Sequence, residues 1–196
     1  MGPTFVLQAL PVAALGAVGT IAGVTAGRMY LGAEFLTIAL TLGLASFAAA
    51  HTFRGSMGWM SVFVAGVSFA AGIVLSRLPS MADPVATRLA VAAAILSLGL
   101  GAVAGRALVP ALGRFYPPLW AAAWLMRALL VVAHLTGAAQ AIALPLGGIT
   151  FALFLGLAAT WFARLPAEPR PALALDLYLL GLNLFLSAGV LQTASA

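Results

Sequence analysis

The chain has 196 residues, of which 64% are hydrophobic and only 7% are charged. A soluble globular domain carries about 25% charged and about 45–50% apolar residues, so this composition excludes a water-soluble fold. Nine arginines and no lysine give a net charge of +5. These arginines stand singly between apolar runs, and no basic cluster indicates a nucleic-acid partner. The chain has no cysteine, which excludes disulfides and thiol-ligated metals.

Seven apolar runs follow one another, each close to the roughly 20 residues that a membrane-spanning helix needs. Short segments containing Pro, Arg and Asp separate them. We therefore predict an all-α, polytopic transmembrane helix bundle of about seven spans. It forms a single integral membrane domain over residues 1–196, surrounded by the lipid bilayer of the cell membrane, in a bacterium the inner membrane. The predicted spans are residues 5–26, 31–50, 57–76, 85–105, 119–135, 141–162 and 172–191.

The short loops give an orientation. The second, fourth and sixth loops together hold five arginines, and the other side holds three, Arg28 and Arg77 in loops and Arg88 at the start of the fourth span. Arginine is enriched in cytoplasmic loops, so this difference predicts a cytoplasmic N-terminus. The segment Ala107–Pro118, before the fifth span, is either a loop or an interfacial turn, and it includes Pro117 and Pro118.

Small residues recur at helical spacing in two spans. Gly19, Gly23 and Gly27 lie four residues apart in the first span, and Gly101 and Gly105 do so in the fourth. Such spacing lets helix backbones approach closely in lipid, so we expect these faces to pack against other helices.

Four charged residues fall inside predicted spans: Glu34 and Arg88 lie three residues after a span start, and Arg127 and Asp176 lie deeper. From the cytoplasmic side, Arg127 lies about 12 Å deep in the fifth span and Asp176 about 6 Å deep in the seventh. Buried charges are usually paired, and an arginine side chain can reach towards the surface. We therefore predict an Arg127–Asp176 ion pair, which is either a structural pair or a proton-sensitive latch.

The seventh span also carries a polar stripe. Asp176, Asn183 and Ser187 fall within about 40° of one another around a helix. Polar groups in a membrane must face protein or water, so the stripe either lines a cation path or forms hydrogen bonds between helices.

Other chemistry is not indicated. The sequence has no nucleophile elbow, zinc-protease motif, phosphate-binding loop or dinucleotide fingerprint, so we predict no enzyme activity. His51 and His134 end spans on opposite faces of the membrane and cannot share one iron, so we expect neither metal nor cofactor. The four tryptophans lie near span ends and are typical of interface anchors: Trp59, Trp120, Trp124 and Trp161.

The run at 174–185, Ala-Leu-Asp-Leu-Tyr-Leu-Leu-Gly-Leu-Asn-Leu-Phe, resembles the last helix of the Bax inhibitor-1 family. Members often read Leu-Tyr-Leu-Asp-x-x-Asn-Leu-Phe there. The matching residues are Leu177, Tyr178, Leu179, Asn183, Leu184 and Phe185. The family acid falls on Leu180 here, and Asp176, one turn earlier, is its substitute. The family's second acid, at the end of the sixth span, has no counterpart.

This resemblance implies seven spans and a pH-sensitive leak for Ca²⁺ or other cations, or a regulator of membrane stress, with Asp176, Arg127, Asn183 and Ser187 as the latch and ion path. Two other classes stay open. One is a non-conducting structural or assembly subunit that binds membrane-protein partners, and the other is a small-molecule permease. A permease predicts internal repeats, and the sequence shows no convincing one.

Overall fold

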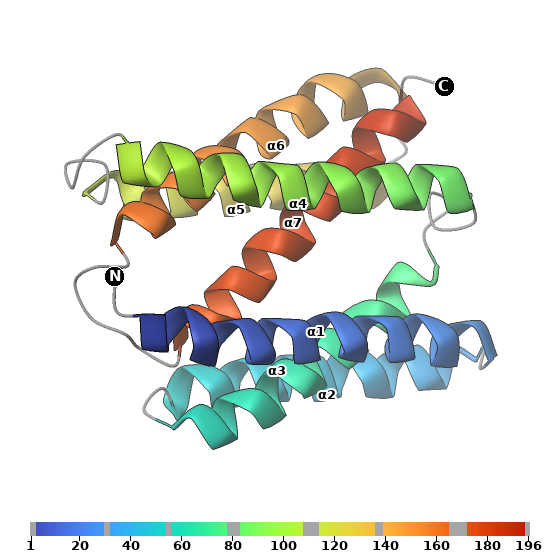
Figure 1. Ribbon diagram of the computed structural model, residues 1–196. Coiled ribbons are helices and arrows are strands. Elements are labelled where there is room, and N and C mark those ends of the chain that lie inside the picture. Colours follow the sequence, from blue (N-terminus) through green and yellow to red (C-terminus); the bar gives the residue numbers. More distant parts are fainter. Residues whose placement is uncertain are drawn as a thin grey trace. The chain divides into compact units, whose positions relative to one another are not determined.

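The computed structural model describes residues 3–29, 32–53, 56–77, 83–107, 114–135, 139–164 and 172–194. Within these ranges the regular elements are seven long α-helices and a single 3₁₀ turn at Arg114 and Phe115 (Figure 1). The all-helical prediction is confirmed, and each helix overlaps one predicted apolar run. The helices are α1 (Pro3–Met29), α2 (Ala33–Thr52), α3 (Met57–Leu75), α4 (Pro84–Ala107), α5 (Tyr116–Leu135), α6 (Ala139–Arg164) and α7 (Ala172–Ala194).

Five helices are long and apolar enough to cross a membrane. The stretches that meet this requirement are Leu10–Met29 in α1, Gly58–Leu75 in α3, Pro84–Gly105 in α4, Ile142–Arg164 in α6 and Ala174–Gln192 in α7. The apolar part of α2, Glu34–Ala50, is shorter. The chain therefore has the elements of a multi-pass membrane protein, and membrane crossing by α2 and α5 stays a prediction.

Two helix starts differ from the predicted spans for a local reason. The segment before the fifth span ends in the 3₁₀ turn, and α5 then begins at Tyr116, so Pro117 and Pro118 lie in its first turn. Proline is tolerated there because the first N–H groups of a helix have no partner within the helix. The same rule starts α4 at Pro84, where Asp83 Oδ1 accepts a hydrogen bond from the Val85 N–H at 2.8 Å.

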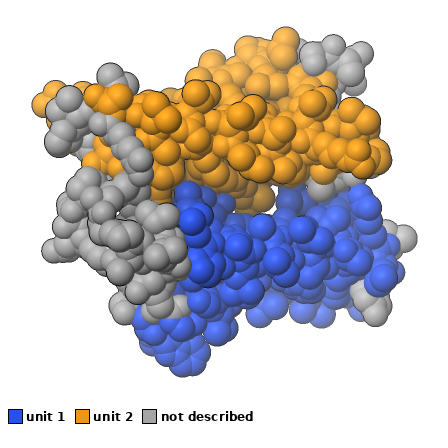
Figure 2. Space-filling view, in the orientation of Figure 1, with its two compact units in different colours: residues 1–81, 168–179 blue, residues 82–167, 180–196 orange. Residues whose placement is uncertain are grey.

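The chain divides into two compact units (Figure 2). Unit 1 comprises residues 1–81 and 168–179, and unit 2 comprises residues 82–167 and 180–196. Helix α7 contributes its first turns to unit 1 and its remaining turns to unit 2. The single membrane domain stays a prediction.

The same packing order occurs in both units. In unit 1, α3 packs against both α1 and α2. In unit 2, α6 packs against both α4 and α5. The third helix of each unit thus contacts the first and the second, which is a structural repeat that the sequence does not reveal.

The predicted small-residue faces form close backbone contacts between these helices. A Cβ atom added to Gly23 of α1 would lie 2.9 Å from the Phe69 backbone carbon and 3.0 Å from the Gly72 Cα atom. In unit 2, a Cβ atom on Gly105 of α4 would lie 2.8 Å from the Phe162 Cβ atom. Both glycines face the third helix of their unit, so the prediction that these faces pack against other helices is confirmed.

Replacing Gly23 by Ala tests whether this contact holds unit 1 together. We expect Gly23→Ala to lower the stability by about 1–3 kcal/mol, because the added methyl group meets rigid backbone rather than a flexible side chain. The measurement is unfolding in mild detergent.

Gly99→Ala is the matched control, since an added Cβ atom at Gly99 in α4 has no neighbour within 4 Å. This substitution should be neutral or raise the stability by up to about 1 kcal/mol, the ordinary helix preference for Ala over Gly. Equal effects of the two substitutions would contradict the close contact.

Candidate functional site

Arg127 lies near the middle of α5 and bonds to one turn of α7 within unit 2. Its Nε atom donates to Asn183 Oδ1 at 3.1 Å. Its Nη2 atom donates to the Asn183 carbonyl oxygen at 2.8 Å and to Ser187 Oγ at 2.7 Å. Ser187 Oγ donates in turn to the same Asn183 carbonyl at 2.8 Å. The guanidinium therefore joins two helices through three hydrogen bonds, which we call the Arg127 clamp.

The clamp is built on an apolar and aromatic support. The Arg127 Cζ atom lies 5.5 Å from the centroid of the Phe154 ring of α6. Phe154 is 1% exposed, and Trp124 of α5 meets its ring edge-on, with centroids 6.1 Å apart. A cation over an aromatic face gains up to about 2 kcal/mol when water is excluded. Arg127 thus contacts both α6 and α7 from its position on α5.

The acceptors of the clamp are neutral. Unit 2 contains one carboxylate in its sequence, Asp83, which caps the start of α4. Asn183 is 4% exposed and Ser187 is fully buried. A charged donor strengthens hydrogen bonds to neutral acceptors, so an amide, a carbonyl and a hydroxyl can hold an arginine without a carboxylate.

Three of the four predicted site residues are therefore in contact with one another. The structure brings together Arg127, Asn183 and Ser187, which the sequence analysis assigned to two separate features. Asp176 is half-buried in the first turns of α7 and belongs to unit 1. The Arg127–Asp176 ion pair joins residues of different units and stays a prediction.

In unit 1, α7 makes a polar contact of its own. The Tyr178 hydroxyl and Thr20 Oγ1 of α1 are 2.9 Å apart, and Thr20 Oγ1 also donates to the Gly16 carbonyl at 2.9 Å. Gly16 leaves room for the Tyr178 ring, because an added Cβ atom would lie 3.0 Å from the ring carbon Cγ. Tyr178 therefore joins α7 to α1 within unit 1, and Asn183 joins α7 to α5 within unit 2. Both residues belong to the run that resembles the Bax inhibitor-1 motif.

Sequence reasoning did not single out Phe154 or Thr20, and it assigned Trp124 to the membrane interface instead of the support of Arg127. Trp124 precedes Arg127 by three residues, so the two share a helix face, and this spacing was the available signal. No feature of the sequence singles out Phe154 or Thr20.

The described residues contain no group of three or more metal-binding side chains. His51 lies in α2 and His134 in α5, and their side chains are outside the described part of the chain. A scan against protein-family models and searches of curated proteins and of solved structures each find no match to this chain.

A double-mutant cycle on Arg127 and Asn183 measures the clamp. We expect Asn183→Leu alone to destabilise strongly, because it removes an acceptor from a buried charge. Arg127→Met combined with Asn183→Leu should be less damaging than the sum of the single changes, with a coupling of about 1–2 kcal/mol. The measurement is unfolding of all four proteins in detergent.

The control cycle pairs Arg127→Met with Ser97→Ala, another buried polar side chain of unit 2. Ser97 lies in α4, whereas the described hydrogen bonds of Arg127 go to Asn183 and Ser187 of α7, so these effects should add. Additive effects at Arg127 and Asn183 as well would show that the clamp contributes no coupling energy.

Proposed function

We propose that this chain is a seven-span membrane protein of the Bax inhibitor-1 type that permits a regulated leak of small cations, Ca²⁺ among them. In this proposal the N-terminus is cytoplasmic and the polar stripe of α7 lines the path. Arg127 closes that path. The observation that carries the proposal is the bonding of Arg127 to Asn183 and Ser187, the two polar residues of the stripe in unit 2.

The charge of the guanidinium explains the closed state. Two unit charges 4 Å apart repel by about 4 kcal/mol at an effective dielectric constant of 20. A cation beside Asn183 would meet this repulsion and would find the amide and hydroxyl oxygens already bonded. Arg127 must therefore leave the stripe before a cation can use it.

The test is Ca²⁺ efflux from proteoliposomes loaded with an indicator dye, between pH 6 and 8. Arg127→Gln should raise the leak about tenfold or more, because a barrier lowered by 1.4 kcal/mol is already a tenfold change in rate. Arg127→Lys keeps the charge and should stay closed. Arg88→Gln, at an exposed position in the first turns of α4, is the matched control and should leave the leak unchanged.

No leak from Arg127→Gln at any pH would overturn the channel proposal and favour a non-conducting assembly subunit.

The repeated packing of the two units favours a second candidate, the small-molecule permease. Each unit contains three consecutive helices in the same packing order. If all of them span, the odd number makes the second set run opposite to the first, and such inverted repeats are frequent in secondary transporters. Saturable uptake of a solute, with no ion leak from Arg127→Gln, would support this class.

A further inference from the structure

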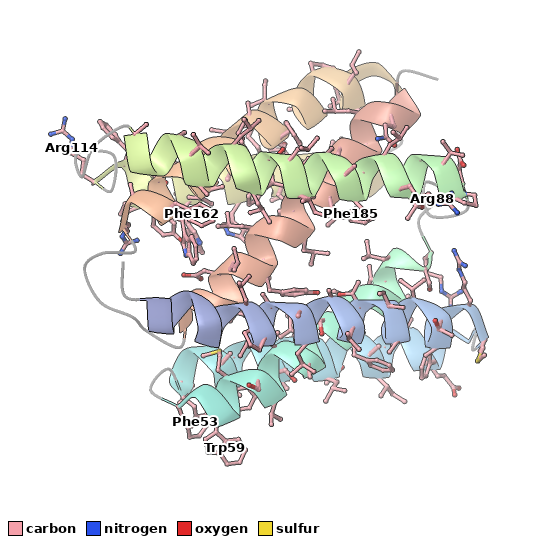
Figure 3. All side chains as sticks on the ribbon, in the orientation of Figure 1. Phe53, Trp59, Arg88, Arg114, Phe162 and Phe185 are labelled. Carbon is pink, nitrogen blue, oxygen red and sulfur yellow. The ribbon has the colours of Figure 1, made fainter. Side chains whose placement is uncertain are left out.

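Arginine and aromatic side chains gather at one end of unit 2, where α5 begins and α6 ends. The Arg164 Cζ atom lies 4.5 Å from the centroid of the Tyr116 ring. The Arg114 Cζ atom lies 5.0 Å from the centroid of the Phe115 ring. Figure 3 shows Arg114 projecting from this end, whereas Arg88 lies at the opposite end of the unit. We call Arg114, Phe115, Tyr116 and Arg164 the basic-aromatic cluster.

The cluster is exposed and bordered by further aromatic rings. Both arginines are exposed, and Phe115 is 45% exposed. Trp120, one turn into α5, is 44% exposed and contacts Trp124, with ring centroids 6.1 Å apart. Rings that are half in contact with protein and half exposed are typical of the headgroup layer of a membrane, where an apolar body meets a polar surface.

Trp161 is not part of this exposed belt. It is 2% exposed and meets Phe162 edge-on, with centroids 4.9 Å apart, so its prediction as an interface anchor is wrong. Its Nε1 atom is buried and has no hydrogen-bond acceptor among the described residues. Trp161 precedes Arg164 by three residues on α6, so an unused donor lies within one helix turn of the cluster.

The distribution of charge complements an anion at this end. Within unit 2, three arginines lie at the end of α4, just before α5 and at the end of α6: Arg106, Arg114 and Arg164. Within unit 2, the single carboxylate, Asp83, lies at the start of α4, the other end of that helix from the cluster.

The ends of long apolar helices lie at the depth of lipid phosphates. Guanidinium groups bind phosphate oxygens through paired N–H donors, and aromatic rings beside them hold the arginines in place. From this charge and geometry we propose that the basic-aromatic cluster binds the headgroup phosphate of an anionic phospholipid in the surrounding leaflet. Arg114 and Arg164 bind the phosphate, and Phe115 and Tyr116 support them. This site is independent of the proposed leak.

The test uses tryptophan fluorescence in vesicles that contain brominated phosphatidylglycerol or brominated phosphatidylcholine as quencher. A Trp59→Phe background restricts the signal to Trp120, Trp124 and Trp161, which all belong to unit 2. We expect phosphatidylglycerol to quench more strongly than phosphatidylcholine. Its relative association constant should fall roughly fivefold for each of Arg114→Gln and Arg164→Gln.

Arg88→Gln is the matched control, because it removes one exposed arginine from the opposite end of unit 2 and should leave the preference unchanged. Arg114→Gln should leave the fold intact, because the described contact of Arg114 is with its neighbour in sequence, Phe115. Equal quenching by the two lipids in the Trp59→Phe protein would overturn the proposal, as would an equal loss in Arg88→Gln. Loss of the preference in millimolar inorganic phosphate would assign the site to free phosphate instead of lipid.

Discussion

The structure of unit 2 depends on one constraint, which is that a permanently charged guanidinium among apolar helices must have its donors satisfied. Arg127 meets this requirement with the side chain and carbonyl of Asn183 and with the hydroxyl of Ser187. These acceptors fix which face of α7 is turned towards α5. The contact with Phe154 adds α6 to the same arrangement, so one side chain orients three helices.

Most other polar side chains are bonded locally and leave the helix surfaces free to pack. Thr150 Oγ1 donates to the Leu146 carbonyl at 2.6 Å, and Ser68 Oγ donates to the Ala65 carbonyl at 3.0 Å. Hydroxyls satisfied in this way can face a neighbouring helix at little cost. Close glycine contacts then bring α1 to α3 and α4 to α6. Among the described side-chain hydrogen bonds, Tyr178 with Thr20 and Arg127 with Asn183 and Ser187 join α7 to other helices.

The sequence predicts the helices well because apolar length is a local property, readable one segment at a time. It also identifies Gly23 and Gly105 as packing positions, but not their partners, since spacing on one helix says nothing about which helix faces it. The Arg127 prediction shows the same limit. The structure shows that an amide, a carbonyl and a hydroxyl from one turn of α7 bind Arg127, and the ion pair with Asp176, chosen for its sign of charge and its depth, stays a prediction. Choosing among such acceptors requires the rotation of α7, which tertiary packing sets.

Depth along the helices separates the roles of the arginines. Arg127 lies eleven residues into α5, about 16 Å from its start, where lipid supplies no acceptor and protein must do so. Arg114 and Arg164 lie at helix ends beside aromatic rings, where protein supplies a platform and the headgroup layer supplies phosphate. An arginine side chain is therefore held by internal hydrogen bonds in the middle of a helix, at Arg127, and is left exposed at helix ends, at Arg114 and Arg164. The two proposals therefore use the same positive charge in opposite ways: the proposed leak is closed by repulsion of cations inside unit 2, and the proposed lipid site attracts anions at its end.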